Sequence, residues 1–300
     1  MNADKKIAII IINWKKYDLT LNCIDSVLKS SYKNFKIILI DNEAQNSFPY
    51  EINKCEKIQI IKNQNNEGFS KANNQGIKYS IKHGFDYVLL LNNDTLIKYD
   101  LIDSLIQQSS TLNQKIIQPL ILNYDGSKIW NAGGKINNFF GTFQTLEKGK
   151  GFKNFKRNRT YTDWFTGCCV LIKVEIFNHV GYFDERFFAY YEDADYSIRL
   201  KKMGYSIALM TDSYLLHYES TSSKSINKSE GNLSPYVHYL NIRNHILLLK
   251  KHSKSFNSIG VLLFQLIKIL SYLIYFLIRF RFNKFKMVSK GLIDALNFKK

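Results

Sequence analysis

The chain has 300 residues, which is enough to bury a sizeable core and suits one large catalytic domain with an appendage. Hydrophobic residues make up 45% and aromatic residues 14%, which excludes a disordered chain, while 3 Pro and 15 Gly exclude a collagen-like one. The formal charge of +17 is concentrated at the end, because residues 241–300 contain 12 Lys and Arg against the single acid Asp294.

Short apolar runs alternate with amphipathic stretches from Ile7 to Leu122, a pattern typical of β-α-β units around a mainly parallel sheet. One predicted helix begins near Asp18, a good N-cap residue, and another covers Ser70–His83 before Gly84. In open α/β sheets ligands bind beyond the carboxyl ends of the strands, so residues at those ends are candidates for chemistry. The predicted strands are Ile7–Ile12, Phe35–Ile40, Lys57–Ile61, Asp86–Leu91 and Ile116–Leu122.

A second block runs from Trp164 to about His217, after a Gly-, Asn- and Lys-rich stretch (123–160) that predicts hairpin or irregular structure. The four cysteines show no C-x-x-C spacing and the N-terminus has no secretory signal, so a reducing cytoplasm is the expected compartment. The predicted elements of this block are the strand Cys168–Lys173, the helices Glu175–His179 and Asp193–Met203, and the strand Ser206–Met210.

The first polar candidate is the pair Asp41 and Asn42, directly after the predicted strand Phe35–Ile40. A carboxylate at this place can accept a hydrogen bond from the imide N–H of uracil or thymine, or from a guanine edge. A turn-forming Asp-Asn pair is the other interpretation, because these two residue types often make Asx turns.

A polar run from Asn65 to Gly76, NNEGFSKANNQG, links a strand to a helix. Gly68 lets the backbone approach a ligand, and the free N–H groups at the start of the helix favour an anion. The run contains neither G-x-G-x-x-G nor the P-loop pattern, which disfavours a dehydrogenase-type dinucleotide site and a P-loop. An ordinary Asn-rich loop with Ser70 as the helix cap is the alternative.

The buried strand that ends at Leu91 is followed by Asn92, Asn93 and Asp94. A carboxylate at this place suits Mg²⁺ or Mn²⁺ held against a diphosphate, because hard oxygen ligands are preferred and the phosphates supply the remainder. One carboxylate makes a weak free site, so metal is expected mainly together with nucleotide; an Asx turn is the alternative. His217 either completes the metal site, binds phosphate or is an ordinary surface histidine.

Acids follow an aromatic run in the segment 187–195, FFAYYEDAD. A carboxylate at the start of a helix, against a partly apolar wall, suits a general base. The aromatic side chains tend to raise its pKa, while the N-terminus of the helix lowers it. The alternative is that Asp193 or Asp195 is only the N-cap, and the two roles are compatible.

Taken together, six segments in this order resemble the inverting glycosyltransferases of family 2, and within it the rhamnosyltransferase-like branch. The resemblance covers about residues 6–250 and implies the α/β GT-A fold, a Rossmann-like nucleotide-binding mixed sheet flanked by helices. It implies transfer of a sugar from a nucleotide-diphosphate sugar, dTDP-rhamnose or a UDP-sugar, to a hydroxyl of a saccharide or polyprenyl-linked acceptor in cell-surface polysaccharide synthesis. The matching segments are residues 9–14, 40–42, 65–76, 91–94, 164–167 and 183–195.

The resemblance also implies roles on the donor side of the site. Asp41 contacts the nucleobase, and Asp94 ends the metal-binding motif for Mg²⁺ or Mn²⁺, with His217 near the metal and the diphosphate. The motif reads Asn92-Asn93-Asp94, so the first acid of the common pattern is missing, which weakens the metal assignment without overturning it. The other implied nucleotide-binding residues are Asn13, Asn66, Gly68, Asn73 and Asn93.

On the acceptor side, the resemblance makes Asp193 the base, with Glu192 beside it, and assigns Trp164 and Gly167 to the pocket for sugar and acceptor. The implied mechanism is a single displacement, in which the base takes the proton of an acceptor hydroxyl whose oxygen attacks the anomeric carbon from the face opposite the nucleotide. Arg243 matches a recurring basic position after the catalytic core whose role stays open.

Three other classes of protein share parts of this pattern. A glycoside hydrolase needs two carboxylates but leaves the Asn-rich segment unexplained. A nucleotidyltransferase shares the sheet and the metal, but the N-terminal part shows no Gly-, Arg- and Lys-rich triphosphate loop. A catalytically inactive membrane-bound scaffold that binds sugar or nucleotide is the alternative from a different class, and the missing first acid at Asn92 favours it.

The predicted division is a catalytic domain at 1–240 and a basic, apolar helical region at 241–300 that associates with membrane. Ile259–Ile278 is long enough to cross a bilayer, but Lys268 and Gln265 in its middle favour a helix lying among anionic headgroups. We therefore expect a cytoplasmic protein that is peripheral on, or anchored to, the inner face of the cell membrane, with no nucleic-acid partner.

Overall fold

The computed structural model describes residues 5–43, 48, 52, 54–156, 160–218 and 231–298. The chain divides into two compact units. Unit 1 comprises residues 1–135, 145–186 and 193–219, and unit 2 comprises residues 136–144, 187–192 and 220–300. The expected functional division at residue 240 stays a prediction, and that residue lies inside helix α7 (Pro235–Lys251).

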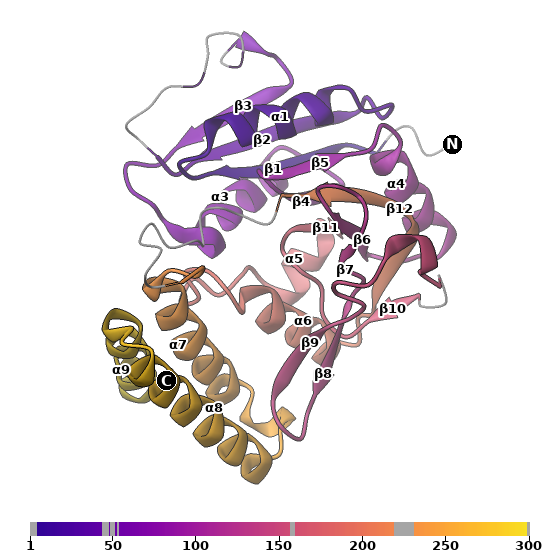
Figure 1. Cartoon of the computed structure of the whole chain (residues 1–300). Helices are drawn as coiled ribbons and strands as arrows, with labels where there is room; N and C mark the ends of the chain where they lie inside the picture. Colours follow the sequence, from indigo (N-terminus) through magenta and orange to yellow (C-terminus); the bar gives the residue numbers. More distant parts are fainter. Residues whose placement is uncertain are drawn as a thin grey trace. The chain divides into compact units, whose positions relative to one another are not determined.

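Unit 1 is built on one mixed sheet, which has ten strands within the described residues (Figure 1). Its strands are β1 (Ile7–Asn13), β2 (Phe35–Asp41), β3 (Ile58–Lys62), β4 (Tyr87–Asn92), β5 (Thr95–Ile97), β6 (Ile116–Asn123), β7 (Ile129–Asn131), β10 (Tyr161–Thr162), β11 (Cys169–Lys173) and β12 (Ile207–His217). The strand order is β10-β12-β6-β11-β4-β1-β2-β3, with β5 paired to β12 and β7 paired to β6. The four N-terminal strands are parallel and β11 is antiparallel to both its neighbours, which confirms the expected mainly parallel start of the sheet.

Helices cover both faces of this sheet because successive side chains of a strand point to opposite sides. The helices of unit 1 are α1 (Tyr17–Leu28), α3 (Gly68–Lys82), α4 (Leu101–Thr111), α5 (Glu175–Val180) and α6 (Glu192–Lys202). In β1, Ile9 and its odd-numbered neighbours share a buried cluster with side chains of α1 and α4. Ile10 instead belongs to a second cluster with side chains of α3, α5 and α6. The carboxyl ends of the strands are left for loops.

Three local predictions are corrected. The first helix begins at Tyr17 with Lys16 as N-cap, so Asp18 lies in the first turn and is not the cap. The second begins at Gly68, which places Ser70 inside the helix. The strand predicted to end at Met210 continues as β12 across an irregularity in its pairing with β6. The short strand β5 and the helix α4 were not predicted individually. β5 has only three residues, which is too few for a pattern, whereas α4 does show a helical apolar period at Leu101, Ile102, Leu105 and Ile106 that was overlooked.

Unit 2 contains the C-terminal helices α7, α8 (Ser258–Ile278) and α9 (Phe282–Asn297), and the hairpin of β8 (Gly134–Asn137) and β9 (Thr142–Thr145) extends into it. Helix α9 is tied to α7 because the Tyr239 hydroxyl donates to Asp294 over 2.8 Å. Lys250 Nζ also donates to the carbonyl of Ala295 over 3.0 Å. The helical C-terminal region is therefore confirmed, and α8 is long and apolar enough to cross a membrane, with a mean hydropathy of 2.2.

Candidate functional site

A chain of hydrogen bonds joins three residues predicted on the donor side. Asn13 Nδ2, at the end of β1, donates to Asp41 Oδ1 at the end of β2 over 3.0 Å. The Thr20 hydroxyl of α1 donates to Asn13 Oδ1 over 2.8 Å, and Asn93 Nδ2 donates to the Thr20 oxygen over 2.8 Å. The parallel register sets Asn13 beside Asp41, so the sheet itself positions the pair.

The second carboxylate oxygen of Asp41 has no hydrogen-bond partner within the described residues, although Asp41 is fully buried. Buried carboxylate oxygens are normally hydrogen-bonded, so this one is an acceptor that a ligand can satisfy. Tyr17 flanks the carboxylate, with its hydroxyl 3.5 Å from Oδ1. Burial and the charge of Asp41 raise the pKa of Tyr17 to about 12, so its hydroxyl stays neutral.

The Asn-rich run forms an ordered turn at the start of α3. Gly68 has a φ of 78°, and its N–H donates to Asn66 Oδ1 over 2.9 Å. Asn42 Nδ2 lies 3.3 Å from the same Asn66 oxygen, which links the turn to the end of β2. Asn73 is buried inside α3, and its amide donates to the carbonyl of Phe69 one turn earlier over 3.0 Å. Asn73 therefore supports the helix locally, whereas Asn66 and Gly68 shape the loop.

The two predicted metal ligands meet in the structure. His217 Nε2 lies 3.1 Å from Asp94 Oδ1, and both side chains are buried. The contact arises because β5, which begins directly after Asp94, pairs antiparallel with the end of β12 and sets Thr95 opposite His217. The N–H of Tyr218 closes the pairing by donating to the Asp94 carbonyl over 2.9 Å.

These two side chains fit an incomplete divalent-metal site. An octahedral ion with ligands at about 2.1 Å separates neighbouring donor atoms by about 3 Å, close to the spacing of Asp94 and His217. Within the described residues no group of three or more His, Cys, Asp or Glu side chains could hold a metal. An ion held here would need its remaining ligands from elsewhere, as expected if metal binds with a diphosphate. The His217 ring packs edge-on against Trp130, with ring centroids 4.3 Å apart, and its Nδ1 is buried without a partner in the described chain.

Asp193, the predicted base, lies in the first turn of α6. Its Oδ2 accepts a hydrogen bond from the Gly167 N–H over 3.2 Å, and its Oδ1 accepts one from the Ala194 N–H over 2.8 Å. Burial raises the pKa of Asp193 to about 6, and these N–H donors oppose the rise. The carboxylate is therefore ionised at neutral pH and takes up a proton more readily than a solvated one does.

All three predicted acids lie along one edge of the sheet of unit 1. Asp41 ends β2, and Asp94 follows β4, whose Asn92 pairs with Ile12 near the end of β1. Because β11 runs antiparallel to β4, its start lies at this same edge, and the N–H of Asn92 donates to the Cys168 carbonyl over 2.9 Å. The neighbouring Gly167 donates to Asp193, so the third acid is tied to the segment that also contacts Asn92, in the predicted metal motif.

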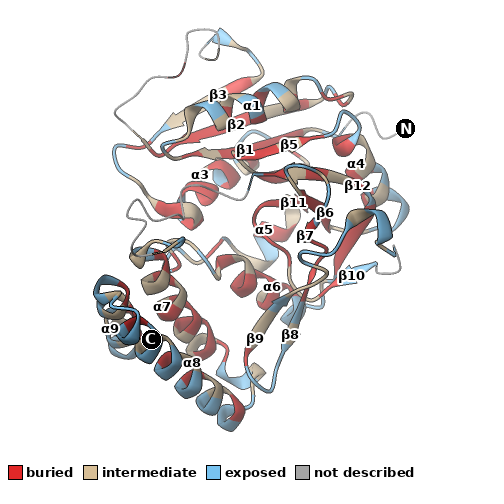
Figure 2. Cartoon of the chain, in the orientation of Figure 1, coloured by how far each residue is buried: buried red, intermediate tan, exposed pale blue. Residues whose placement is uncertain are grey.

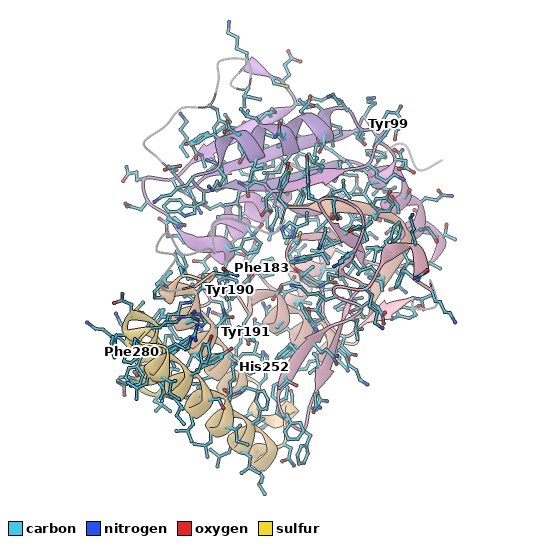
Figure 3. The ribbon with its side chains drawn as sticks, viewed as in Figure 1. Tyr99, Phe183, Tyr190, Tyr191, His252 and Phe280 are labelled. Carbon is cyan, nitrogen blue, oxygen red and sulfur yellow. The ribbon has the colours of Figure 1, made fainter. Side chains whose placement is uncertain are left out.

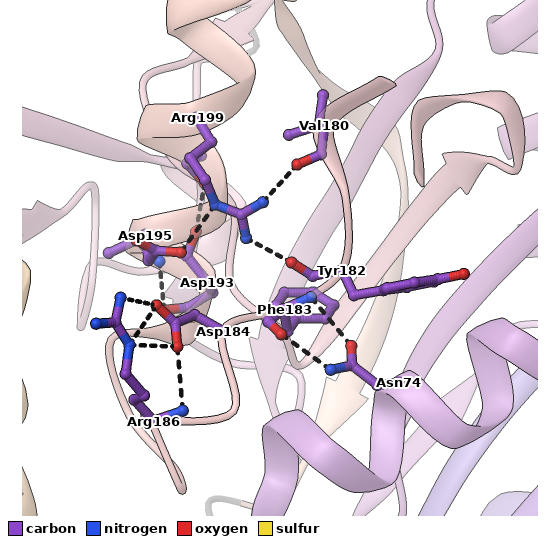
Figure 4. A network of polar contacts seen from close by, with 11 residues as sticks. Asn74, Val180, Tyr182, Phe183, Asp184, Arg186, Asp193, Asp195 and Arg199 are labelled. Carbon is purple, nitrogen blue, oxygen red and sulfur yellow. Dashed lines mark hydrogen bonds and ion pairs between the residues drawn. The ribbon is translucent and has the colours of Figure 1, made fainter. Parts of the chain in front are cut away.

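The segment before the acidic motif is held by side chains from two helices of unit 1 (Figure 4). Asn74 of α3 binds both backbone groups of Phe183, donating to its carbonyl over 2.9 Å and accepting from its N–H over 3.0 Å. From α6, Arg199 pairs with the buried Asp195 over 3.0 Å. Arg199 also donates to the carbonyls of Val180 and Tyr182. Helices α3 and α6 thus hold the same segment, residues 180–183, and the sequence alone did not predict this.

The two remaining predicted residues are Trp164 and Glu192. The Trp164 ring lies against Gly134, where any Cβ would fall 2.0 Å from the indole Nε1, so only glycine fits there. Glu192 is the first residue of α6 and is buried. A cavity of about 510 Å³, which Lys150 and Lys156 help to line, contains none of the predicted site residues.

Comparison with known proteins decides the family. The model of the family described as "Glycosyl transferase family 2" matches residues 8–181. The chain belongs to this family. The glycosyltransferase is 26% identical over 262 residues to dTDP-rhamnosyl transferase RfbF of Shigella flexneri, covering 86% of this chain and 85% of that protein. It is 25% identical over 207 residues to N-acetylglucosaminyl-diphospho-decaprenol L-rhamnosyltransferase of Mycobacterium tuberculosis, covering 62% and 67%.

These relatives confirm the rhamnosyltransferase-like branch that the six segments predicted. The expected GT-A fold is confirmed as well. The glycosyltransferase superimposes on the crystal structure of GalNAc-T7 with UDP, GalNAc and Mn²⁺ with a TM-score of 0.59 at 15% identity, covering 82% of this chain and 48% of that one. At this level of identity the likeness establishes the fold alone.

Proposed function

We propose that this glycosyltransferase moves a sugar, with inversion, from a pyrimidine nucleotide-diphosphate sugar to a saccharide acceptor in polysaccharide synthesis. dTDP-rhamnose is the first candidate donor, since the similar protein of Shigella flexneri is named a dTDP-rhamnosyl transferase. The observation that carries the proposal is that Asp41, Asp94 and Asp193 occupy one edge of the sheet, where α/β folds bind their ligands.

Asp41 recognises the nucleobase of the donor. Thymine and uracil each present one imide N–H, and the unpartnered Oδ2 of Asp41 is a charged acceptor for it. The Asn13 amide holds the other carboxylate oxygen, so the side chain is already oriented before the nucleotide binds. The turn at Asn66 and Gly68 then offers backbone N–H groups to the nucleotide.

The diphosphate is bound near Asp94 and His217, which would hold Mg²⁺ or Mn²⁺. When bound, the ion supplies positive charge to the departing diphosphate. The buried Nδ1 of His217 offers a further contact to a phosphate oxygen or to water.

Transfer requires that Asp193 accept a proton. Its carboxylate takes the proton of an acceptor hydroxyl, the oxygen forms a bond to the anomeric carbon, and the bond from that carbon to the diphosphate breaks. The Gly167 and Ala194 N–H groups fix the carboxylate while this happens. One displacement inverts the anomeric configuration.

The test is release of nucleoside diphosphate by the full-length protein from dTDP-rhamnose, UDP-sugars and GDP-sugars, with Mn²⁺ or Mg²⁺ and with a chelator. We expect metal-dependent release from one pyrimidine donor and its loss in Asp94→Ala. Equal binding of all three nucleotides in thermal-shift measurements, without release from any donor, would contradict the proposal.

An inactive sugar- or nucleotide-binding scaffold is the second candidate. It is favoured by the Asn at position 92 and by the lack of a three-ligand metal group within the described residues. A scaffold binds nucleotide but releases no diphosphate, and it has no need of a carboxyl with a raised pKa. Release that depends on Asp193 would exclude it.

A second part of the proposal is that unit 2 lies on an anionic membrane, with a polyprenyl-linked acceptor presented there. Helix α8 exposes a broad apolar face, much of it pale blue in Figure 2. The residues of this face are Ile259, Leu262, Leu263, Leu266, Ile267, Leu270, Ile274, Leu277 and Ile278. Exposed basic residues accompany it, namely Lys254, Arg279, Lys286 and Lys290.

The orientation of the polar residues of α8 favours a helix in the plane of the membrane. Gln265 and Lys268 both point inward, to within 3.2 Å and 3.0 Å of His245 on α7. Phe276 packs inward as well, in a cluster with residues of α7 and α9. Only one side of α8 is therefore free for lipid, and its partners α7 and α9 carry too many charges to enter a bilayer.

A further inference from the structure

Two residues with a left-handed backbone stand directly before the acidic motif. Tyr190 has a φ of 70° and Tyr191 a φ of 71°, and the next residues are Glu192 and Asp193. The two tyrosines are labelled in Figure 3. A bulky side chain rarely adopts this conformation, and such strained positions cluster at functional sites when surrounding contacts enforce them. The contacts that hold Tyr190 and Tyr191 in this conformation come from α7 and lie within unit 2.

Asn244 binds the backbone of the strained segment. Its Nδ2 donates to the carbonyls of Ala189 and Tyr190, over 2.8 Å and 3.0 Å. The neighbouring Arg243 donates from Nη1 to Asn244 Oδ1 over 2.8 Å. A guanidinium only donates, so this contact fixes which end of the amide faces the two carbonyls. The basic position that sequence comparison singled out thus orients an amide.

His245 binds the side chain of the same segment. Its ring stacks on Tyr191 with centroids 4.9 Å apart and planes 9° apart. Its Nε2 lies 2.7 Å from the carbonyl of Gly141, which only accepts, so Nε2 carries the proton and Nδ1 is an acceptor. Gln265 and Lys268 of α8 donate to that Nδ1. Burial and the charge of Lys268 lower the pKa of His245 to about 3, so the ring is neutral near neutral pH and keeps its proton on Nε2.

We propose that Asn244 and His245 are positioning residues that hold Tyr190 and Tyr191 in the left-handed conformation and thereby fix the chain that leads into Asp193. Gln265 and Lys268 brace His245 from the lipid-facing helix. This inference rests on the proposed function, because it takes Asp193 as the base. It explains why an apolar helix keeps an amide and an ammonium group in its middle.

The first test is Asn244→Ala in the full-length protein. We expect kcat to fall about 10- to 100-fold, because misplacing a reacting group by about 1 Å has effects of that size. The donor KM should stay within about twofold, because donor binding does not use Asp193. The matched control is Asn241→Ala, since Asn241 lies on the same helix and its amide donates within its own turn, to the Val237 carbonyl over 3.0 Å. The control should keep wild-type kcat.

The second test separates strain from general stability. Glycine adopts a positive φ without steric cost, so Asn244 has less to enforce in a chain that carries Tyr190→Gly. In that background, the fold loss of kcat caused by Asn244→Ala should be less than a third of the fold loss that the same substitution causes in the wild-type protein. If Asn244→Ala does not fold, Asn244→Leu carries the test, because leucine has the same branching at Cγ but no N–H to donate, and it should lower kcat about as far as alanine.

The outcomes distinguish this inference from the proposed function. If the wild-type protein releases no diphosphate, or Asp193→Asn matches the wild type, the proposed function fails. If the wild type depends on Asp193 but Asn244→Ala keeps its kcat, the positioning role is overturned. A loss of kcat that is equally large in the Tyr190→Gly background overturns it too, as does a loss confined to the donor KM.

Discussion

At the residue scale, we expect the pH dependence of turnover to be set by Asp193, the proposed base. Burial raises its pKa to about 6, and a general base must be ionised to accept a proton. Activity should therefore be full above about pH 7 and fall about tenfold for each pH unit below 6. Steady-state kcat with saturating donor measures this, and a profile that is flat between pH 5 and pH 8 would contradict the assignment.

Substitution of the same residue gives an independent prediction. Asp193→Asn keeps an acceptor for Gly167 or Ala194 but cannot take up a proton, so kcat should fall about 10²- to 10⁴-fold. Nucleotide affinity, measured by calorimetry, should stay unchanged. Near-normal turnover in this variant would mean that another group is the base.

The prediction for Asp41 concerns the affinity for the donor and not the rate of the chemical step. Asp41→Asn can keep the bond from Asn13 through its oxygen, and it then turns an NH₂ group toward the imide N–H of the nucleobase. Loss of a hydrogen bond to a charged acceptor costs about 1.5–3 kcal/mol, so the donor Kd should rise roughly 10- to 100-fold. Asp25→Asn, at a side chain of α1 that is 62% exposed, is the control. Unchanged affinity in Asp41→Asn would remove the nucleobase from this position.

The sequence predicted those site residues whose place follows from local order. Asp41 and Asp94 directly follow apolar strands, so their position at the edge of the sheet could be inferred. The contact of Asp94 with His217 could not be derived from spacing, because it depends on the pairing of β5 with β12 across 123 residues. Thr20 was missed because a buried hydroxyl on an amphipathic helix carries no sequence signal.

At the scale of elements, the site depends on how closely α3 approaches β1. A Cβ at Gly76 would fall 2.7 Å from Ile10 Cδ1, so glycine is required for the helix to lie against the strand. Gly76→Ala should destabilise the protein by about 1–3 kcal/mol through overpacking. Ile10→Ala opens the space, so the double variant should be more stable than the sum of the two single effects. Denaturant unfolding measures the cycle, and strict additivity would show that the two residues do not meet.

Local sequence patterns predicted the N-terminal strands of the sheet but not the starts of two helices or a long-range contact. The first parallel strands were predicted to within about two residues, because apolar runs bounded by polar loops identify buried strands. The ends of α1 and α3 were misplaced, since Asp18 and Ser70 are good caps by residue type but lie inside their helices. The scaffold of Asn74 and Phe183 joins residues 109 apart, and only the folded sheet brings them together.

At the scale of the whole molecule, membrane binding should depend on the apolar face of α8. The double variant Ile267→Glu with Leu270→Glu places two charges on that face without touching its inner side. Sedimentation with phosphatidylcholine vesicles that contain phosphatidylglycerol should show wild-type binding and a partition weakened by roughly tenfold or more in the variant. Tyr99→Glu, at an exposed aromatic residue of unit 1, is the control. Equal pelleting of variant and wild type would place the lipid contact elsewhere.

The most direct test of the whole account is a crystal structure of the full-length protein with dTDP and Mn²⁺. We expect the thymine imide N–H at the unpartnered oxygen of Asp41, the ion on Asp94 and His217, and the diphosphate on the side of the sheet edge where Asp193 lies. Nucleotide bound away from Asp41, or an ion held by other side chains, would contradict the claim that the three acids form one site.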